Sequence, residues 1–555
     1  MKNRVTRLLL AALLIGAAPS LAGAQDAGKL QAEVKALSAR VDEIIDKSLR
    51  EAGVQAAPQA EPYQFYRRLN LDLGGRIPDL IDIRDYIDDP TPDKRWNWAE
   101  KLIDSDKFVN HFANVLRAQM ITVDNNFQVL GQLPSFEAWL KQRLQANVPY
   151  DAMVRELLTG QPFGNQPQFG GGQPGMVQGS TAAFYFANEN KAENLAGSTA
   201  RIFLGVKLEC AQCHAHPFAK WTREQFWEFA AFFNGINPQQ FRQPGRPAPN
   251  NIGRREILIP GTKTMVKAKY LDGKLPAWKD SDDSRAVLAN WIVSPENPYF
   301  AKATVDMVWQ YFFGVSLLEP IIEPHDDSPI THPELLDLLA RELIDHKFDL
   351  KFLIRTVVQT RAYHRSSASA TKITPEELLL FARMPVRGMS PEQIFDSLAE
   401  ATQYKQQPNQ FQQRAVFPGQ PSTPRADFLA KFANQDRRNE SQTSILQALF
   451  MMNGKFLAER TRIDPTMTTE KLAGLSDTEQ QRINASLHGI ALQSTPIAQK
   501  LESMYLLVLS RPPRPEETQR LVRYVETGGP ARDQRQAIAD VYWALLNSGE
   551  FLLNH

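Results

Sequence analysis

The stretch Leu204-Gly-Val-Lys-Leu-Glu-Cys-Ala-Gln-Cys-His-Ala-His-Pro-Phe218 is the most informative part of the chain. It contains Cys210 and Cys213, the only two cysteines in 555 residues, and His214 follows them directly. This spacing is the attachment signature of a c-type haem, because two thioethers hold the edge of the macrocycle while the next imidazole binds its iron. The motif therefore predicts a covalent haem c on Cys210 and Cys213, with His214 as an axial iron ligand.

The same residues are compatible with other sites. Cys210 and Cys213 can form a local disulfide, although so short a loop removes little entropy from the unfolded chain. A thiol redox pair usually begins a helix that follows a strand, and no clear strand precedes Cys210. Zinc is a further alternative, with His214 or His216 as a third ligand, although a closed structural zinc site normally uses a second ligand cluster.

The first 24 residues have the pattern of a cleavable signal peptide. Lys2, Arg4 and Arg7 form a positively charged N-terminal region, and Leu8 to Ile15 is apolar. Ala22-Gly-Ala24 then has the small residues of a signal-peptidase cleavage site. We expect the mature protein to begin at Gln25 and to be periplasmic or secreted. No later apolar run is long enough to cross a bilayer, so no membrane span is expected after cleavage. An oxidising compartment suits haem attachment and a disulfide equally.

The charge balance excludes one class of partner. The chain has 63 Lys and Arg against 62 Asp and Glu, a formal net charge of +1, so it has no basic field for nucleic acid. A redox partner protein, whose identity the sequence does not give, is the expected partner. The sequence contains no nucleophile elbow, phosphate-binding glycine loop or zincin helix, so it carries no direct enzyme signature.

Helical periodicity dominates the chain and predicts a mainly α fold. Leu30 to Ala52, Asp93 to Ile103 and Asp106 to Met120 each place apolar residues at helical spacing. Ala192 to Phe203 is a further helical run that leads to the cysteines. The fold class expected is therefore two helical domains with irregular loops and a short extended segment between them.

A new helix is predicted after the cysteine motif. Thr222 and Gln225 form a capping box at its start. Phe226, Phe229 and Phe233 then lie on one face. Such an aromatic stripe is typical of an ordinary core, and it could also form the wall of a site for a flat macrocycle.

The C-terminal half is also helical by pattern. Thr331-His-Pro-Glu334 predicts a capped helix start, and Asp349 predicts the start of the next helix. His325-Asp-Asp327 with His332 is a second ligand-like cluster, which we interpret as caps and solvated charge rather than a metal site. Three polar or glycine-rich stretches are expected to be loops that proteases cut early, at Gly160 to Ser180, Pro238 to Asn251 and Gln406 to Pro424.

Two motifs together resemble a known family. Arg201-Ile-Phe-Leu-Gly-Val-Lys-Leu-Glu-Cys-Ala-Gln-Cys-His-Ala-His-Pro-Phe218 and Tyr66-Arg-Arg-Leu-Asn-Leu-Asp-Leu-Gly-Gly-Arg-Ile-Pro78 are similar to planctomycete-type secreted proteins with the domain of unknown function 1549, also called a planctomycete cytochrome C domain. Ala215 and Ala219 stand where that family more often has Asp. Segments from Arg285 onward, including His332-Pro-Glu-Leu-Leu-Asp-Leu-Leu-Ala340, resemble the partner domain of unknown function 1553.

The resemblance implies a division of the chain into domains. After the signal peptide at 1–24, residues 25–237 would form the domain of unknown function 1549 and residues 284–555 the domain of unknown function 1553. Residues 238–283 would be a linker with an extended segment. The implied function is that of an exported, single-haem, cytochrome-like protein with an electron-transfer or redox role; the alternative is a non-haem binding or scaffold protein in which the motif is a metal or disulfide staple.

A haem on this motif leaves the opposite face of the iron either to another residue or open to a small molecule. His216 is too close to His214 in sequence to reach that face. His111, Met120 and Met265 are the candidates for the sixth ligand, since imidazole and thioether are the side chains that most often take this position.

Overall fold

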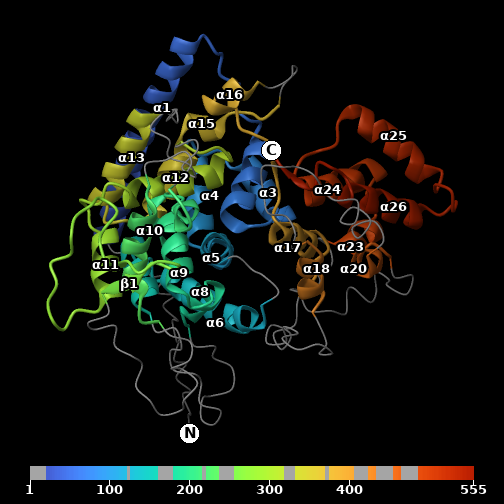
Figure 1. Cartoon of the computed structure of the whole chain (residues 1–555). Coiled ribbons are helices and arrows are strands. Elements are labelled where there is room, and N and C mark those ends of the chain that lie inside the picture. Colours follow the sequence, from blue (N-terminus) through green and yellow to red (C-terminus); the bar gives the residue numbers. More distant parts are fainter. Residues whose placement is uncertain are drawn as a thin grey trace, which may run out of the picture.

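A computed structural model describes residues 21–121, 126–160, 179–215, 221–236, 255–317, 332–368, 374–405, 423–432, 454–463 and 486–555. The described chain is mainly helical, as the periodicity predicts, and its strands are short (Figure 1). The predicted loops at Gly160 to Ser180, Pro238 to Asn251 and Gln406 to Pro424 lie almost entirely outside the described residues. The mainly α fold class is therefore confirmed for the part of the chain that can be described.

The helical elements up to the cysteine motif are α1 (Leu21–Ala52), α2 (Pro62–Leu69), η1 (Asn70–Gly74), α3 (Leu80–Asp88), α4 (Lys94–Ile103), α5 (Asp106–Met120), α6 (Phe127–Gln145), α7 (Tyr150–Thr159), α8 (Ala182–Ala187), α9 (Ala192–Thr199), η2 (Ala200–Leu204) and η3 (Glu209–Gln212). Those that follow are α10 (Arg223–Ala230), η4 (Ala231–Phe233), α11 (Ser284–Ile292), α12 (Phe300–Phe313), α13 (Pro333–Asp345), α14 (Leu350–Gln359), α15 (Arg361–His364), α16 (Pro375–Leu379), α17 (Pro391–Ala401), α18 (Pro424–Phe432), α20 (Lys455–Arg460), α23 (Leu487–Leu492), α24 (Ile497–Leu509), α25 (Pro515–Glu526) and α26 (Gln534–Leu546). Here η1 and η2 are π-helical, whereas η3 and η4 are 3₁₀ turns.

The long helix α1 shows how periodicity determines packing. Val34, Leu37, Val41, Ile45 and Leu49 are all buried, and they form one stripe at the spacing of a helix face. This stripe packs against α13, α14 and α15, which come from the C-terminal half of the chain. The helix α1 is therefore held by elements about 300 residues away in sequence. A hydrogen bond adds to this packing, because Ser38 Oγ donates to Thr356 O at 2.9 Å.

Capping residues place most of the predicted helix starts correctly. Ser105 accepts from Phe108 N at the start of α5, and Asp349 accepts from Lys351 N at the start of α14. The predicted capping box of Thr222 and Gln225 is present at the start of α10. The helix α13 begins at Pro333 with His332 at its N-cap, while Thr331 lies outside the described residues.

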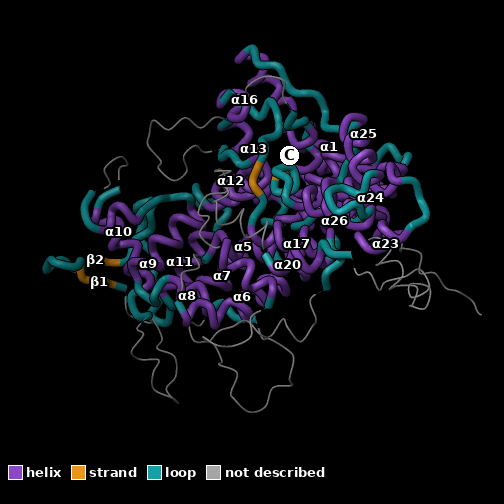
Figure 2. The backbone as a smooth tube through the Cα atoms, turned by 90° about the vertical axis from the view of Figure 1, so that its right-hand side faces the viewer, coloured by secondary structure: helices purple, strands orange, loops and turns teal. Residues whose placement is uncertain are grey.

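Two short antiparallel pairs of strands complete the described fold. Strands β1 (Glu256–Leu258) and β2 (Met265–Lys267) form a hairpin that projects from the body beside α10 (Figure 2). It lies within the segment 238–283, where an extended piece was predicted. Strands β3 (Arg387–Gly388) and β4 (Leu553–Asn554) bring the last residues of the chain back into its centre.

The described part of the predicted linker is packed rather than free. Tyr270 stacks on Phe232 with ring centroids 5.4 Å apart, and on Trp291 at 4.8 Å. It therefore joins η4, on one side of the segment, to α11 on the other. The buried apolar residues form a core that extends from Val34 to Phe551. The domain division at 238 and 284 stays a prediction.

No helix among the described residues is both long enough and apolar enough to cross a membrane. The helices α23 to α26 lie together on one side of the molecule, beyond α3 and α17 (Figure 1). The chain leaves α26 and returns toward the centre, where β4 pairs with β3.

Candidate functional site: the Cys-x-x-Cys-His turn and a buried arginine cluster

The cysteine motif follows a helix that ends in a tight turn. The helix α9 continues into the π-helix η2, which stops at Gly205 with φ of 67°. Such a left-handed conformation is readily adopted only by glycine. Val206 N then donates to Ala200 O at 3.0 Å, which turns the chain toward the cysteines. Gly205 is thus the local reason that the motif leaves the helix where it does.

The two cysteines lie on an anchored turn. Leu208 and Ala211 are fully buried, so the 3₁₀ turn η3 is fixed to the core at two points. Cys210 and Cys213, by contrast, are both exposed free thiols. No disulfide joins them in this structure. Both sulfurs are therefore accessible to a reagent or a cofactor.

His214 is exposed and its ring is oriented by its neighbour's backbone. Its Nδ1 lies 2.6 Å from Ala215 O. A carbonyl oxygen only accepts, so Nδ1 must carry the proton and donate. In a neutral imidazole this leaves the lone pair on Nε2, which is the arrangement that metal-binding histidines use.

The helix α10 holds the turn through the carbonyl between the cysteines. Trp227 Nε1 donates to Gln212 O at 3.1 Å, and Arg223 Nε donates to the same oxygen at 3.4 Å. Arg223 also donates through Nη2 to Pro260 O at 2.6 Å. A single guanidinium group therefore connects the cysteine turn to the loop of the β1–β2 hairpin.

A close approach on the other side of the turn depends on glycine. A Cβ at Gly197 would lie 2.7 Å from Glu209 Cγ, so no larger residue fits without movement. The Glu209 carboxylate accepts from Arg201 Nε at 3.2 Å. The turn η3 therefore packs against α9 at Gly197, and the need for a glycine at this position is visible only in the three-dimensional structure.

The aromatic stripe of α10 and η4 belongs to the core. Phe226, Phe229 and Phe233 are fully buried, and Trp227 is 3% exposed. They are covered by protein, so the possibility that this stripe forms an open wall for a macrocycle is wrong. The physical reason is that α9, η4 and the hairpin all pack against α10.

The three sixth-ligand candidates lie in different environments. His111 is buried, its Nε2 lies 2.6 Å from Tyr311 Oη, and a Cβ at Gly75 would be 2.4 Å from its Nδ1. Met120 is also buried. Met265 is instead 54% exposed on β2. The structure thus separates one accessible thioether from two side chains that fill the core.

The second ligand-like cluster is described only in part. His332 is buried, and neither of its ring nitrogens has a hydrogen-bond partner among the described residues. Burial lowers its pKa to about 4. His325-Asp-Asp327 and His216 lie outside those residues. Within the described ranges, no group of three or more His, Cys, Asp or Glu side chains is arranged to hold a metal ion.

A buried polar cluster that the sequence reasoning missed surrounds Asp72, in the Tyr66 to Pro78 motif. The Asp72 carboxylate is 1% exposed and accepts from Arg387 Nη2 at 2.8 and 2.9 Å. Tyr363 Oη donates to it at 2.9 Å and Asn554 Nδ2 at 2.7 Å. Burial, together with the Asp72 charge, raises the pKa of Tyr363 well above its usual value, so the phenol stays a donor.

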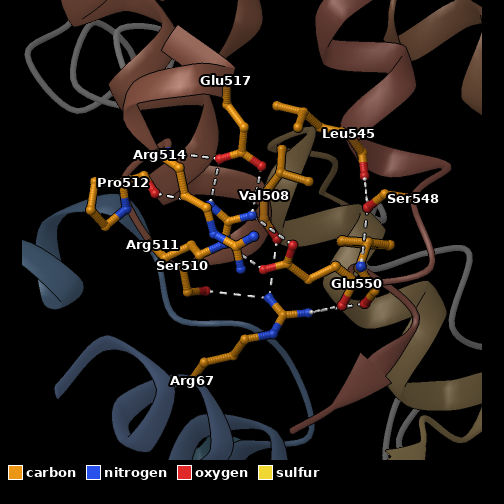
Figure 3. Close-up of polar contacts among 11 residues, drawn as sticks. Arg67, Val508, Ser510, Arg511, Pro512, Arg514, Glu517, Leu545, Ser548 and Glu550 are labelled. Carbon is orange, nitrogen blue, oxygen red and sulfur yellow. Dashed lines mark hydrogen bonds and ion pairs between the residues drawn. The ribbon is translucent and has the colours of Figure 1, made fainter. Parts of the chain in front are cut away.

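Two arginines of the same motif extend this cluster. Arg67 donates to Val508 O at 3.1 Å and to Phe551 O at 2.9 Å. Figure 3 shows its contacts with Val508, Ser510 and Glu550. Arg68 donates to Tyr363 O at 2.6 Å and to Arg365 O at 3.0 Å. Burial lowers the pKa of both guanidinium groups to about 10.

An ion-pair network lies at the outer edge of this cluster (Figure 3). Arg511 contacts Glu517 at 2.8 Å and Glu550 at 2.6 Å. Burial raises the pKa of Glu550, but the hydrogen bonds and positive charge of Arg511, together with the charges of His555 and Arg67, outweigh it and lower that pKa. The motif that resembles the N-terminal part of the family thus fastens α2 and η1 to the last helices of the chain.

The fold and the motif define a mainly helical protein with an exposed Cys-x-x-Cys-His turn. Two family models match the chain. The family described as a protein of unknown function (DUF1549), with the short name PSCyt2, matches residues 40–238, and a second protein of unknown function (DUF1553), PSD1, matches residues 284–434. The chain therefore carries the two domains as a pair. Neither the curated proteins nor the solved structures contain a match.

Proposed function

We propose that this chain is an exported, cytochrome-like protein that carries one covalent haem c on Cys210 and Cys213. Its function would be electron transfer, or redox chemistry on an extracytoplasmic substrate, with a partner protein. The observation that carries the proposal is the accessibility of both thiols on one anchored turn, directly before an exposed histidine. The short name of the matching family, PSCyt2, points the same way.

The residues of the turn fit the chemistry of such a group. Thioether bonds would form at the two exposed sulfurs, and His214 would bind the iron through Nε2, since its Nδ1 donates to Ala215 O. A bound haem would supply a one-electron couple. Leu208 and Ala211 keep the turn fixed to the core, and Arg223 and Trp227 hold its central carbonyl. This chain's own residues therefore provide attachment and orientation.

The test is production of the full chain, signal segment included, in a host with a haem-maturation system. We expect a Soret band and an intact mass that exceeds the polypeptide by one haem. Replacement of both cysteines by alanine should abolish both signals. His214→Ala should keep the added mass but change the ligand-sensitive bands.

Export is tested on the same material. We expect N-terminal sequencing of the periplasmic or secreted protein to begin at Gln25. A chain that retains Met1 in the membrane fraction would contradict the export part of the proposal.

Other outcomes would establish the alternative function. Stoichiometric zinc without haem, lost equally on replacement of His214 and of the cysteines, would identify a metal staple. A disulfide between Cys210 and Cys213 in the exported protein, with no Soret band, would identify a scaffold protein with a covalent staple. Either result would refute the cytochrome reading.

A further inference from the structure

The β1–β2 hairpin is tied directly to the cysteine turn. Arg223 donates to Gln212 O, next to Cys213, and to Pro260 O in the loop of the hairpin. The base of the hairpin is held separately, because Lys269 N donates to Glu228 O of α10 at 3.2 Å. Both ends of the hairpin are therefore fixed relative to the turn that carries the thiols.

One face of this hairpin presents an apolar pair to solvent. Leu258 and Met265 are directly opposite each other in the register, with exposed fractions of 48% and 54%. The neighbouring pair, Ile257 and Val266, points to the other face and packs against the core. Two adjacent exposed apolar side chains form a small apolar surface that a flat apolar group can cover, and burial of that surface would be favourable.

The chemistry of Met265 identifies it as a ligand candidate. A thioether is a soft ligand that binds haem iron opposite histidine. Among the three candidates, His111 and Met120 are buried in the core, and His111 already contacts Tyr311 through Nε2. Met265 alone of these three is exposed, and it lies on an element fastened to the cysteine turn.

We propose that the β1–β2 hairpin forms the second wall of the haem site and that Met265 is the second axial ligand of the iron. This inference rests on the proposed function. Leu258 would cover the macrocycle beside the ligand, and Arg223 would be a positioning residue that keeps the hairpin over the turn. The exposed pair would then be buried in the haem-loaded protein.

The experiment uses the haem-loaded full chain and compares Met265→Ala with Ile81→Ala, which truncates a comparably exposed apolar side chain on α3, outside the proposed site. Intact mass reports attachment, and electron paramagnetic resonance with visible spectra reports the spin state. We expect the parent protein and I81A to be low-spin, whereas M265A should keep the added mass, become high-spin and bind carbon monoxide without displacing a ligand. Its midpoint potential should fall, because methionine ligation raises the potential.

Two more variants secure the interpretation. Met265→His should restore a low-spin iron at a lower potential than the parent, and it decides the matter if M265A yields too little protein. Arg223→Ala should give a mixture of spin states. A parent with attached haem that is already high-spin, or an M265A protein that stays low-spin, would overturn this inference alone. A parent without added haem mass would refute the proposed function and this inference together.

Discussion

Replacement of Asp72 by alanine should destabilise the whole protein, because this carboxylate neutralises a buried guanidinium group. Arg387 contacts both oxygens of Asp72, and Tyr363 and Asn554 donate to the same group. Asp72 is 1% exposed, and the Arg387 side chain is 13% exposed. In D72A, water cannot easily reach the three donors that lose their acceptor.

The magnitude follows from the separate losses. Removing one partner of a buried ion pair costs about 3–5 kcal/mol, because the remaining charge stays buried without compensation. Each buried donor that loses its partner adds about 1–3 kcal/mol, although the local structure relaxes and these terms do not sum fully. We therefore expect the free energy of unfolding to fall by about 5 kcal/mol.

The assay is urea unfolding, followed in parallel by tryptophan fluorescence and far-ultraviolet circular dichroism. Coincident transitions with an unchanged slope permit a comparison of free energies. Asp72→Asn separates charge from shape, since it keeps the volume but removes the charge, and most of the loss should remain. The matched control is Asp93→Ala, which breaks the exposed pair between Lys35 and Asp93.

The control should have no resolvable effect, because exposed ion pairs contribute little. If D72A unfolds at the same urea concentration as D93A, the cluster does not hold the protein together. If D72N is as stable as the parent, the charge of Asp72 is unimportant and only its hydrogen-bonding shape matters.

Further outcomes concern acid stability and the cysteine turn. Burial lowers the pKa of His332 to about 4 and that of His364 to about 3, where the nearby Arg95 adds to the effect. The unfolded chain therefore takes up these protons first, so stability should decrease from about pH 6.5 down to about pH 4, by about 1.4 kcal/mol per pH unit for each group. His332→Leu should reduce the pH dependence of the free energy of unfolding by about 1.4 kcal/mol per pH unit between about pH 6.5 and about pH 4. The melting temperature should then change less with pH than in the parent protein. An unchanged pH dependence would contradict the lowered pKa of His332. Gly197→Ala should push Glu209 away from α9, destabilise the turn by about 1–3 kcal/mol and reduce the yield of attached haem. The double variant with Glu209→Ala should recover most of the loss, and a failure to recover would show that the strain lies elsewhere.

Local signals predicted the helices well, because they depend on neighbours in sequence. Thr222 with Gln225 and Asp349 place two helix starts correctly. The stripe from Val34 to Leu49 gives the buried face of α1. Each of these features is settled within one or two turns of chain, so the residues themselves carry the information.

The buried arginine cluster could not be predicted in the same way. Arg67 and Arg68 look like ordinary polar positions of a helix, because their partners at Val508 and Tyr363 are hundreds of residues away. Gly197 gave no signal either, since its importance depends on the position of Glu209. The cysteine motif was visible because its three residues are adjacent, whereas the hairpin beside it is joined to it only by tertiary contacts.

The contact between Asp72 and Asn554 has a consequence for biosynthesis. The two residues are 482 positions apart, so Asn554 leaves the ribosome long after Asp72. At a synthesis rate of about 5–20 residues per second, the interval is roughly 25–100 s. During that interval Asp72 lacks the Asn554 donor, and Arg67 lacks its carbonyl acceptors on Val508 and Phe551 until those residues have been made. The central packing around Asp72 therefore cannot be complete until Asn554 has been synthesised, so this late residue sets the earliest time at which α2 and η1 can reach their final state.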